Sequence, residues 1–208
     1  SQDELFNFLG DHTFKDMTTT YAAFGEATYE VVSDVDVTLG GRLERENRRR
    51  QLLTGPFFAP VDFDETYEVF LPKAGVAWHV QPNWTVGTTV ARGYNGGGAG
   101  VTFGTGTLYE FSPEYVWNYE AYTRLDLLGG RLNLTGNVFY ADYKSMQLPF
   151  APGPNEAIVL NAPKAHTIGS EIGARYLAAP GLTVFGSIGL LRTEIDEHEL
   201  RDEQPERP

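Results

Sequence analysis

The sequence predicts an all-β fold: an antiparallel up-and-down sheet of the kind that closes into a transmembrane β-barrel. Apolar and polar residues alternate with a period of two along long segments, as expected for strands that have one apolar and one polar face. Most of these segments have about 12–16 residues, more than the ~9–11 that a tilted strand needs to cross a bilayer. Short turns and long loops also alternate along the chain, which is typical of outer-membrane barrels.

Eight strands are predicted, at residues 17–32, 35–46, 67–80, 84–92, 114–128, 131–146, 164–178 and 182–196. The clearest alternation lies in the second, where the odd positions from 35 to 43 are Val, Val, Leu, Gly and Leu. The even positions from 36 to 44 are Asp, Thr, Gly, Arg and Glu. The first and fourth segments alternate less clearly, because small residues occupy both of their faces.

The remaining segments separate the two kinds of residue in the same way. Their apolar faces carry, in chain order, Phe70, Val76 and Trp78; Tyr115, Trp117, Tyr119, Leu125 and Leu127; Leu132, Leu134, Val138 and Tyr140; Ile168, Ile172, Ala174 and Tyr176; and Leu182, Val184, Ile188 and Leu190. The polar faces are expected to line a wet lumen, where cross-strand ion pairs satisfy their charges. The lumen-facing polar residues are predicted to include Arg42, Glu44, Glu120, Arg124, Asp126, Glu171 and Arg175.

The connections are sorted by length. Short turns are predicted at 33–34, 81–83, 129–130 and 179–181, each rich in residues that reverse the chain. Long loops are predicted at 47–66, 93–113 and 147–163, with polar tails at 1–16 and 197–208. Tyr and Trp residues lie near both ends of the strands, where interfacial girdles occur. We therefore expect periplasmic turns on one side and extracellular loops on the other.

Composition excludes several classes of function. The formal net charge of −12 argues against nucleic-acid binding, which needs a basic surface. The sequence contains 0 cysteines, which excludes disulfides, thiolate metal sites and thiol catalysis. The 4 histidines lie on separate segments without metal-ligand spacing, and no nucleophile motif is present. We therefore expect no enzyme activity, no cofactor and no metal.

A sheet within lipid must close, because unpaired backbone groups there are costly. Eight strands can close by themselves, but two features favour a larger barrel. The polar face is rich in small residues, which suits a wide lumen, and the chain ends after an acidic loop rather than within a strand. A complete eight-stranded outer-membrane protein with an adhesive or structural role remains an alternative, as does a soluble β-sandwich whose apolar faces are covered by a second layer.

Several runs of residues resemble one family, the TonB-dependent outer-membrane receptors. The similar runs are Tyr21 to Tyr29, Val37 to Glu44, Leu71 to Val76, Ala91 to Gly98, Phe111 to Glu114 with Asn118 to Glu120, and Asn161 to Glu171, which follows the pattern N-A-x-K-A-x-x-x-G-x-E. The resemblance covers about residues 17–196. Single motifs are loose, but their order and spacing together are fairly specific.

The resemblance implies a siderophore-receptor-like protein of the bacterial outer membrane, with a 22-stranded barrel and an N-terminal plug. On that basis residues 1–208 are expected to be a partial barrel domain that lacks the plug and the final strands. The family takes up ferric siderophores or other scarce ligands by active transport. The implied partners are the ligand, the TonB–ExbB–ExbD complex acting through the plug, and outer-membrane lipid such as lipopolysaccharide.

Two features are candidates for ligand binding. Arg42, Arg45, Arg48, Arg49 and Arg50 form a basic cluster that could attract an anionic ferric chelate or bridge lipopolysaccharide phosphates, although a solvated loop is the alternative. The glycine-rich segment 93–100 lacks the lysine and the helix of a phosphate-binding loop. It is expected to be a mobile extracellular loop, with Tyr94 and Asn95 at its base available for ligand contacts.

Overall fold

The computed structural model describes residues 13–54, 62–102, 108–151 and 158–196. They form ten strands: β1 (Thr13–Val32), β2 (Val35–Thr54), β3 (Asp62–Gln81), β4 (Trp84–Asn95), β5 (Gly98–Val101), β6 (Leu108–Phe111), β7 (Glu114–Leu127), β8 (Leu132–Phe150), β9 (Ile158–Ala179) and β10 (Leu182–Ile195). Among the described residues, no helix is long and apolar enough to cross a membrane.

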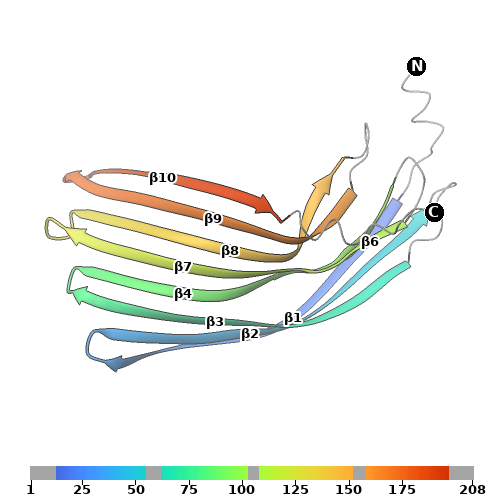
Figure 1. The fold of residues 1–208 in the computed structure, drawn as a ribbon, viewed down its shortest axis with the longest axis horizontal. Helices are drawn as coiled ribbons and strands as arrows, with labels where there is room; N and C mark the ends of the chain where they lie inside the picture. The colour runs from blue at the N-terminus through green and yellow to red at the C-terminus, as the bar shows by residue number, and fades with distance from the viewer. Residues whose placement is uncertain (1–12, 55–61, 103–107, 152–157, 197–208) are drawn as a thin grey trace, which may run out of the picture.

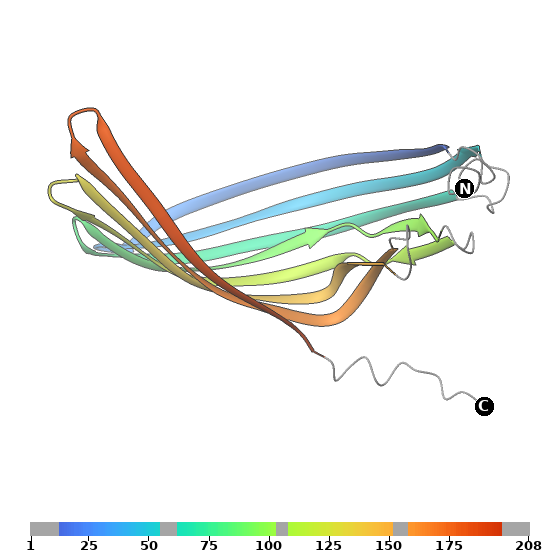
Figure 2. The same cartoon turned by 90° about the horizontal axis from the view of Figure 1, so that it is seen from above.

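Eight of the strands form one sheet in the order β1-β2-β3-β4-β7-β8-β9-β10, with antiparallel pairing between neighbours. This order confirms the predicted up-and-down antiparallel topology. Figures 1 and 2 show a single curved layer whose short turns all lie at one end. β1 and β10 are the two edges and do not pair with each other in the described part of the chain, so the sheet is an open part of a barrel wall.

The short turns lie where the sequence predicts them. Asp34 has a φ of 67°, and Gly130 and Gly181 both have a φ of 82°. These are left-handed conformations, which glycine adopts without a steric penalty. Tight reversals at these points set the register that places every apolar residue of a strand on the same face.

The strands extend further than predicted at the opposite end. β2 continues to Thr54 and β3 begins at Asp62, so most of the predicted loop 47–66 is paired strand. β8 and β9 likewise extend into the predicted loop 147–163. The prediction failed because both faces are polar there, which removes the period-two signal. The hairpin of β5 and β6, within the predicted loop 93–113, was also missed.

The apolar face has no second layer of protein over it. Leu39, Leu43 and Ile172 lie on interior strands, and each exposes more than 60% of its surface (63%, 62% and 63%). Apolar surface on this scale is unfavourable in water, at about 25 cal/mol per Å², and marks an interface. The β-sandwich alternative is therefore excluded for the described residues, and the apolar face is suited to lipid.

Candidate functional site: the mouth of the barrel wall

The candidate site lies at the end of the sheet opposite the short turns, which we call the mouth. There β5 and β6 form a hairpin that contacts β2, β3 and β9 (Figure 1). The whole of β5 is buried, with Ala99 3% and Val101 7% exposed. The glycine-rich segment is therefore a packed strand at the mouth, and the prediction of a free loop was wrong.

The glycines of this segment are needed for close packing. A Cβ atom on Gly97 would lie 2.6 Å from the carbonyl oxygen of Phe111 and 2.6 Å from the hydroxyl of Tyr67. A backbone oxygen cannot move aside as a flexible side chain can. The glycine run thus permits the backbone of the hairpin to approach its neighbours, a function that its sequence does not distinguish from flexibility.

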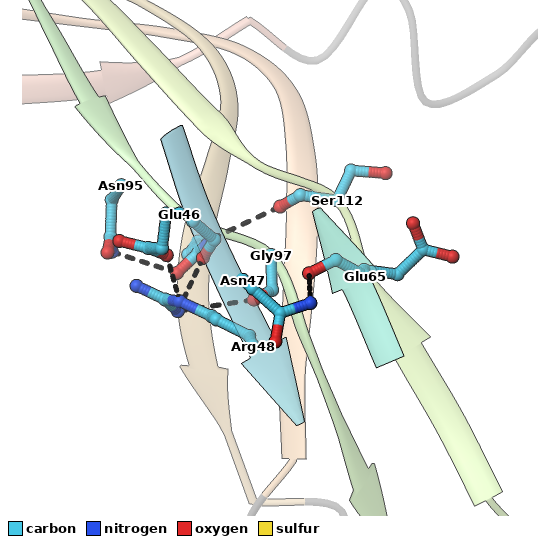
Figure 3. A network of polar contacts seen from close by, with 9 residues as sticks. Glu46, Asn47, Arg48, Glu65, Asn95, Gly97 and Ser112 are labelled. Carbon is cyan, nitrogen blue, oxygen red and sulfur yellow. Dashed lines mark hydrogen bonds and ion pairs between the residues drawn. The ribbon is translucent and has the colours of Figure 1, made fainter. Parts of the chain in front are cut away.

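Two arginines of β2 bind the hairpin backbone. Arg48 Nη1 donates hydrogen bonds to the carbonyl oxygens of Gly96, at 3.0 Å, and Gly97, at 3.1 Å (Figure 3). Arg50 Nη1 donates one to the carbonyl of Ala99, at 2.9 Å. Arg48 is also paired with the buried carboxylate of Glu46 on the same strand. Glu46 and Arg48 satisfy each other while Arg48 holds the hairpin, which limits the cost of burying the carboxylate.

A second network joins the hairpin to β8. The side chain of Gln147 donates to the carbonyls of Gly96, at 3.0 Å, and Ser112, at 3.1 Å. Asn95 donates to the Gln147 side-chain oxygen at 3.0 Å, and the Gln147 backbone N–H donates to a carboxylate oxygen of Glu114 at 2.6 Å. Asn95, a predicted ligand-contact residue, therefore belongs to the framework of the mouth.

Asn161 at the start of β9 makes the third set of contacts. Its Nδ2 donates to the carbonyls of Ser112, at 3.0 Å, and Ser145, at 2.8 Å, and its Oδ1 accepts from the Ser112 N–H at 2.7 Å. The Val159 N–H donates to the Tyr109 hydroxyl of β6 at 3.3 Å. Sequence reasoning did not select Gln147 or Asn161, although both flank a predicted loop, where amide side chains often satisfy backbone groups.

Three tyrosines line the mouth beside the hairpin. The Tyr94 ring lies 6.2 Å from that of Tyr67 and 5.6 Å from that of Tyr115, between centroids. Tyr94 lies beyond Ala91, the last β4 residue that pairs with β3. Burial raises the pKa of Tyr94 well above its ordinary value, and the nearby Glu46 carboxylate adds to the effect. The Tyr94 hydroxyl is buried and has no hydrogen-bond partner among the described residues.

The predicted arginine cluster is divided between the two faces. Arg45 and Arg49 lie on the apolar side of the sheet, in register with Glu68 and Asp64. Arg45 Nη1 is 3.3 Å from a Glu68 oxygen, and Arg49 Nη2 is 2.7 Å from an Asp64 oxygen. Hydrogen bonding to Arg49 lowers the pKa of Asp64, and the same bond raises the pKa of Arg49. Both arginines are therefore matched by acids on the outer wall.

The polar face below the mouth holds the remaining predicted residues. The register places Arg42, Glu44, Glu120, Arg124, Asp126, Glu171 and Arg175 there. A concave depression of about 550 Å³ is lined by Glu120, Arg124 and Glu171, among others. Arg42 Nε lies 2.6 Å from a Glu44 oxygen, and Asn137 donates to Glu120 at 3.1 Å. This face is thus charged, largely paired and wet.

A sequence model of the family described as "TonB dependent receptor-like, beta-barrel" matches residues 4–204. The chain belongs to this family. Its members are outer-membrane receptors, which agrees with the exposed apolar face and localises the protein to the bacterial outer membrane. Among the described residues, no group of three or more His, Asp or Glu side chains is arranged to hold a metal ion.

Solved structures show the same fold. The ferric yersiniabactin uptake receptor FyuA of Yersinia pestis is 24% identical, with a TM-score of 0.71 over 90% of this chain and 28% of that one. The alcaligin outer-membrane receptor FauA of Bordetella pertussis is 16% identical, with a TM-score of 0.66 over 88% and 31%. The siderophore receptor PiuA of Acinetobacter baumannii gives 16%, 0.67, 88% and 26%. The chain therefore spans less than a third of these TonB-dependent receptors.

Proposed function

We propose that this chain forms part of the wall and mouth of a receptor that takes up ferric siderophores, or similarly scarce ligands, by TonB-dependent active transport. The observation that carries the proposal is the hairpin of β5 and β6, held at the mouth by Arg48 and Arg50 beside a row of tyrosines. Cationic and aromatic groups suit an anionic ferric chelate, since guanidinium groups match oxyanions and rings stack on planar ligands.

The proposed ligand contacts are the groups that this arrangement presents at the mouth. Arg48, Arg50, Tyr94 and Asn95 all lie next to the hairpin. Arg45 and Arg49 lie on the outer wall in ion pairs, and we assign them no ligand. The relatives named above bind or take up siderophores by their own descriptions, which supports this class of ligand.

We further propose that residues 1–208 are a partial barrel domain whose plug and remaining strands lie elsewhere in the protein. The proposal is supported by the open edges at β1 and β10 and by the share of 28% of FyuA that the chain covers. Energy would come from the TonB–ExbB–ExbD complex through the plug. The protein is proposed to transport without catalysing a covalent reaction, and the outer wall to contact outer-membrane lipid.

Deleting the gene that encodes this chain tests the proposal. Iron-starved cells are given radiolabelled ferric siderophores one at a time, with and without a functional TonB. We expect at least one siderophore to lose TonB-dependent uptake on deletion and to regain it on complementation. The variant R48Q/R50Q should restore less uptake than R45Q/R49Q, which removes the same charge from the outer wall. Unchanged uptake of every ferric siderophore tested would refute the proposed ligand class.

A further inference from the structure

A basic pocket lies on the outer wall near the mouth, apart from the ligand site. Its volume is about 520 Å³, and its lining includes the cations Arg92, Lys144 and Lys164 and the rings of Tyr115 and Trp117. Among the described residues that line it, Asp142 is the one acid. An excess of positive charge is notable in a chain with a net charge of −12, because most of its cations are matched by acids.

The register shows which face the pocket occupies. Arg92, Trp117 and Asp142 form one cross-strand row, and Tyr115, Lys144 and Lys164 form the next. Directly opposed residues share a face, and residues two apart on a strand share it as well. The neighbouring row of Tyr119, Tyr140 and Ile168 belongs to the exposed apolar face. The cations therefore project on the lipid side of the wall.

The height of the pocket matches the polar region of the membrane. From Leu127 at the short-turn end of β7 to Trp117 is about eleven residues, the length that a tilted strand needs to cross the hydrocarbon. Trp117 thus lies at the outer boundary, where interfacial aromatics are found, and Lys144 and Lys164 lie one row above it. That row is the level at which lipid headgroups carry their phosphates.

The local arrangement favours a bound anion. Lys144 and Lys164 are exposed and directly opposed in the register, an arrangement that is unfavourable unless an anion lies between the two charges. Arg92 is held with its guanidinium carbon 4.6 Å from the Tyr115 ring centroid, and its buried Nε has no hydrogen-bond partner among the described residues. Arg92 is thus fixed in place with a donor unused. The outward Arg45 and Arg49 differ, because each already has a carboxylate partner.

We propose that this pocket binds the phosphate of a phosphorylated glycolipid in the outer leaflet, of the lipopolysaccharide type. Lys144 and Lys164 contact the phosphate, Arg92 donates from the side of β4, and Trp117 packs on the sugar or the start of the acyl chains. The surface continues downward into an apolar groove of about 380 Å³ lined by Val138, Ile168 and Leu190, which suits an acyl chain. A free phosphate ion would use the cations and not the groove.

The test uses the protein expressed from its own gene and purified from outer membranes in mild detergent. The glycolipid that copurifies is counted by native mass spectrometry for the wild type, for K144Q/K164Q and for the matched control R45Q/R49Q. Two lost charge-assisted contacts should lower retention about tenfold in K144Q/K164Q, and the control should retain wild-type levels. Equal retention in both variants overturns the proposal. Circular dichroism of each variant shows whether the barrel is intact.

A competition experiment separates a lipid site from a simple anion site. Bisphosphorylated lipid A, its dephosphorylated form and inorganic phosphate are each added to delipidated protein. We expect lipid A to bind, its dephosphorylated form to bind at least about tenfold more weakly, and inorganic phosphate at equal concentration not to displace lipid A. Displacement by inorganic phosphate, or equal binding of both lipid forms, overturns the glycolipid assignment. None of these outcomes depends on which ligand the receptor transports.

Discussion

Replacing Arg48 with methionine removes a single guanidinium from the contact between β2 and the hairpin. The variant loses the two hydrogen bonds to the carbonyls of Gly96 and Gly97, and it leaves the buried Glu46 carboxylate without its cation. Methionine keeps the length and apolar stem of the side chain. The change therefore tests the polar contacts rather than the packing.

The magnitude follows from these contacts. Hydrogen bonds that involve a charged group contribute about 1.5–3 kcal/mol each, and breaking a buried ion pair costs about 3–5 kcal/mol. The Arg48 side chain is 30% exposed, so solvent screens part of the effect. We expect the free energy of opening the hairpin to fall by about 3 kcal/mol, which is roughly a hundredfold increase in the open population.

Hydrogen exchange measured by mass spectrometry on the protein in detergent reads out this opening. Amides of Gly98–Val101 and Leu108–Phe111, which form the hairpin ladder, should exchange about a hundredfold faster in R48M. The matched control is R49M, since Arg49 is the next residue but pairs with Asp64 on the other face. A double variant, E46Q/R48M, should recover part of the protection because the unpaired charge is gone. Unchanged exchange in R48M would show that the arginine does not hold the hairpin.

Three further changes follow from the site. Gly97→Ala should displace the hairpin, because the added Cβ meets the Phe111 carbonyl at 2.6 Å, and should raise the same exchange rates, whereas Gly25→Ala, with nothing within 4 Å, should not. Asn161→Ala loses three hydrogen bonds and should cost about 2–3 kcal/mol in chemical denaturation. Because burial raises the pKa of Tyr94, its contribution to stability should be complete below pH ~10 and be lost as pH rises further. Ultraviolet absorbance at pH ~11 should therefore show one fewer tyrosinate than Tyr94→Phe-insensitive titration predicts: wild type and Tyr94→Phe should have equal absorbance, and a lower value in Tyr94→Phe would contradict the raised pKa.

The membrane-crossing part of the fold was predictable because its physics is local. In the segment from Val35 to Glu44 every second residue must face lipid, so the period of two is visible in the sequence itself. The turn at Gly129 and Gly130 is visible for a similar reason, since both glycines adopt a positive φ, of 65° and 82°. Each of these features depends on a constraint that acts within a few residues.

The mouth was not predictable in the same way. Arg48, Arg49 and Arg50 are consecutive, so polarity does not alternate and the segment resembles a solvated loop. What makes it a strand is a set of partners far along the chain, such as Asp64 for Arg49 and the carbonyl of Ala99 for Arg50. Glycines show the same ambiguity, because a flexible loop and a closely packed hairpin need the same residue. Long-range pairing decided both cases.

The wall uses its cations differently on its two faces, and the difference explains why adjacent arginines have different roles. Arg48 and Arg50 face the mouth, where backbone carbonyls of the hairpin accept their hydrogen bonds. Arg45 and Arg49 face outward, and a carboxylate on β3 matches each. Lys144 and Lys164 also face outward, yet they stand opposite each other rather than opposite acids. Since a like-charged pair on a membrane-facing wall needs a counter-anion, the phosphate layer of the outer leaflet is the nearest source of one.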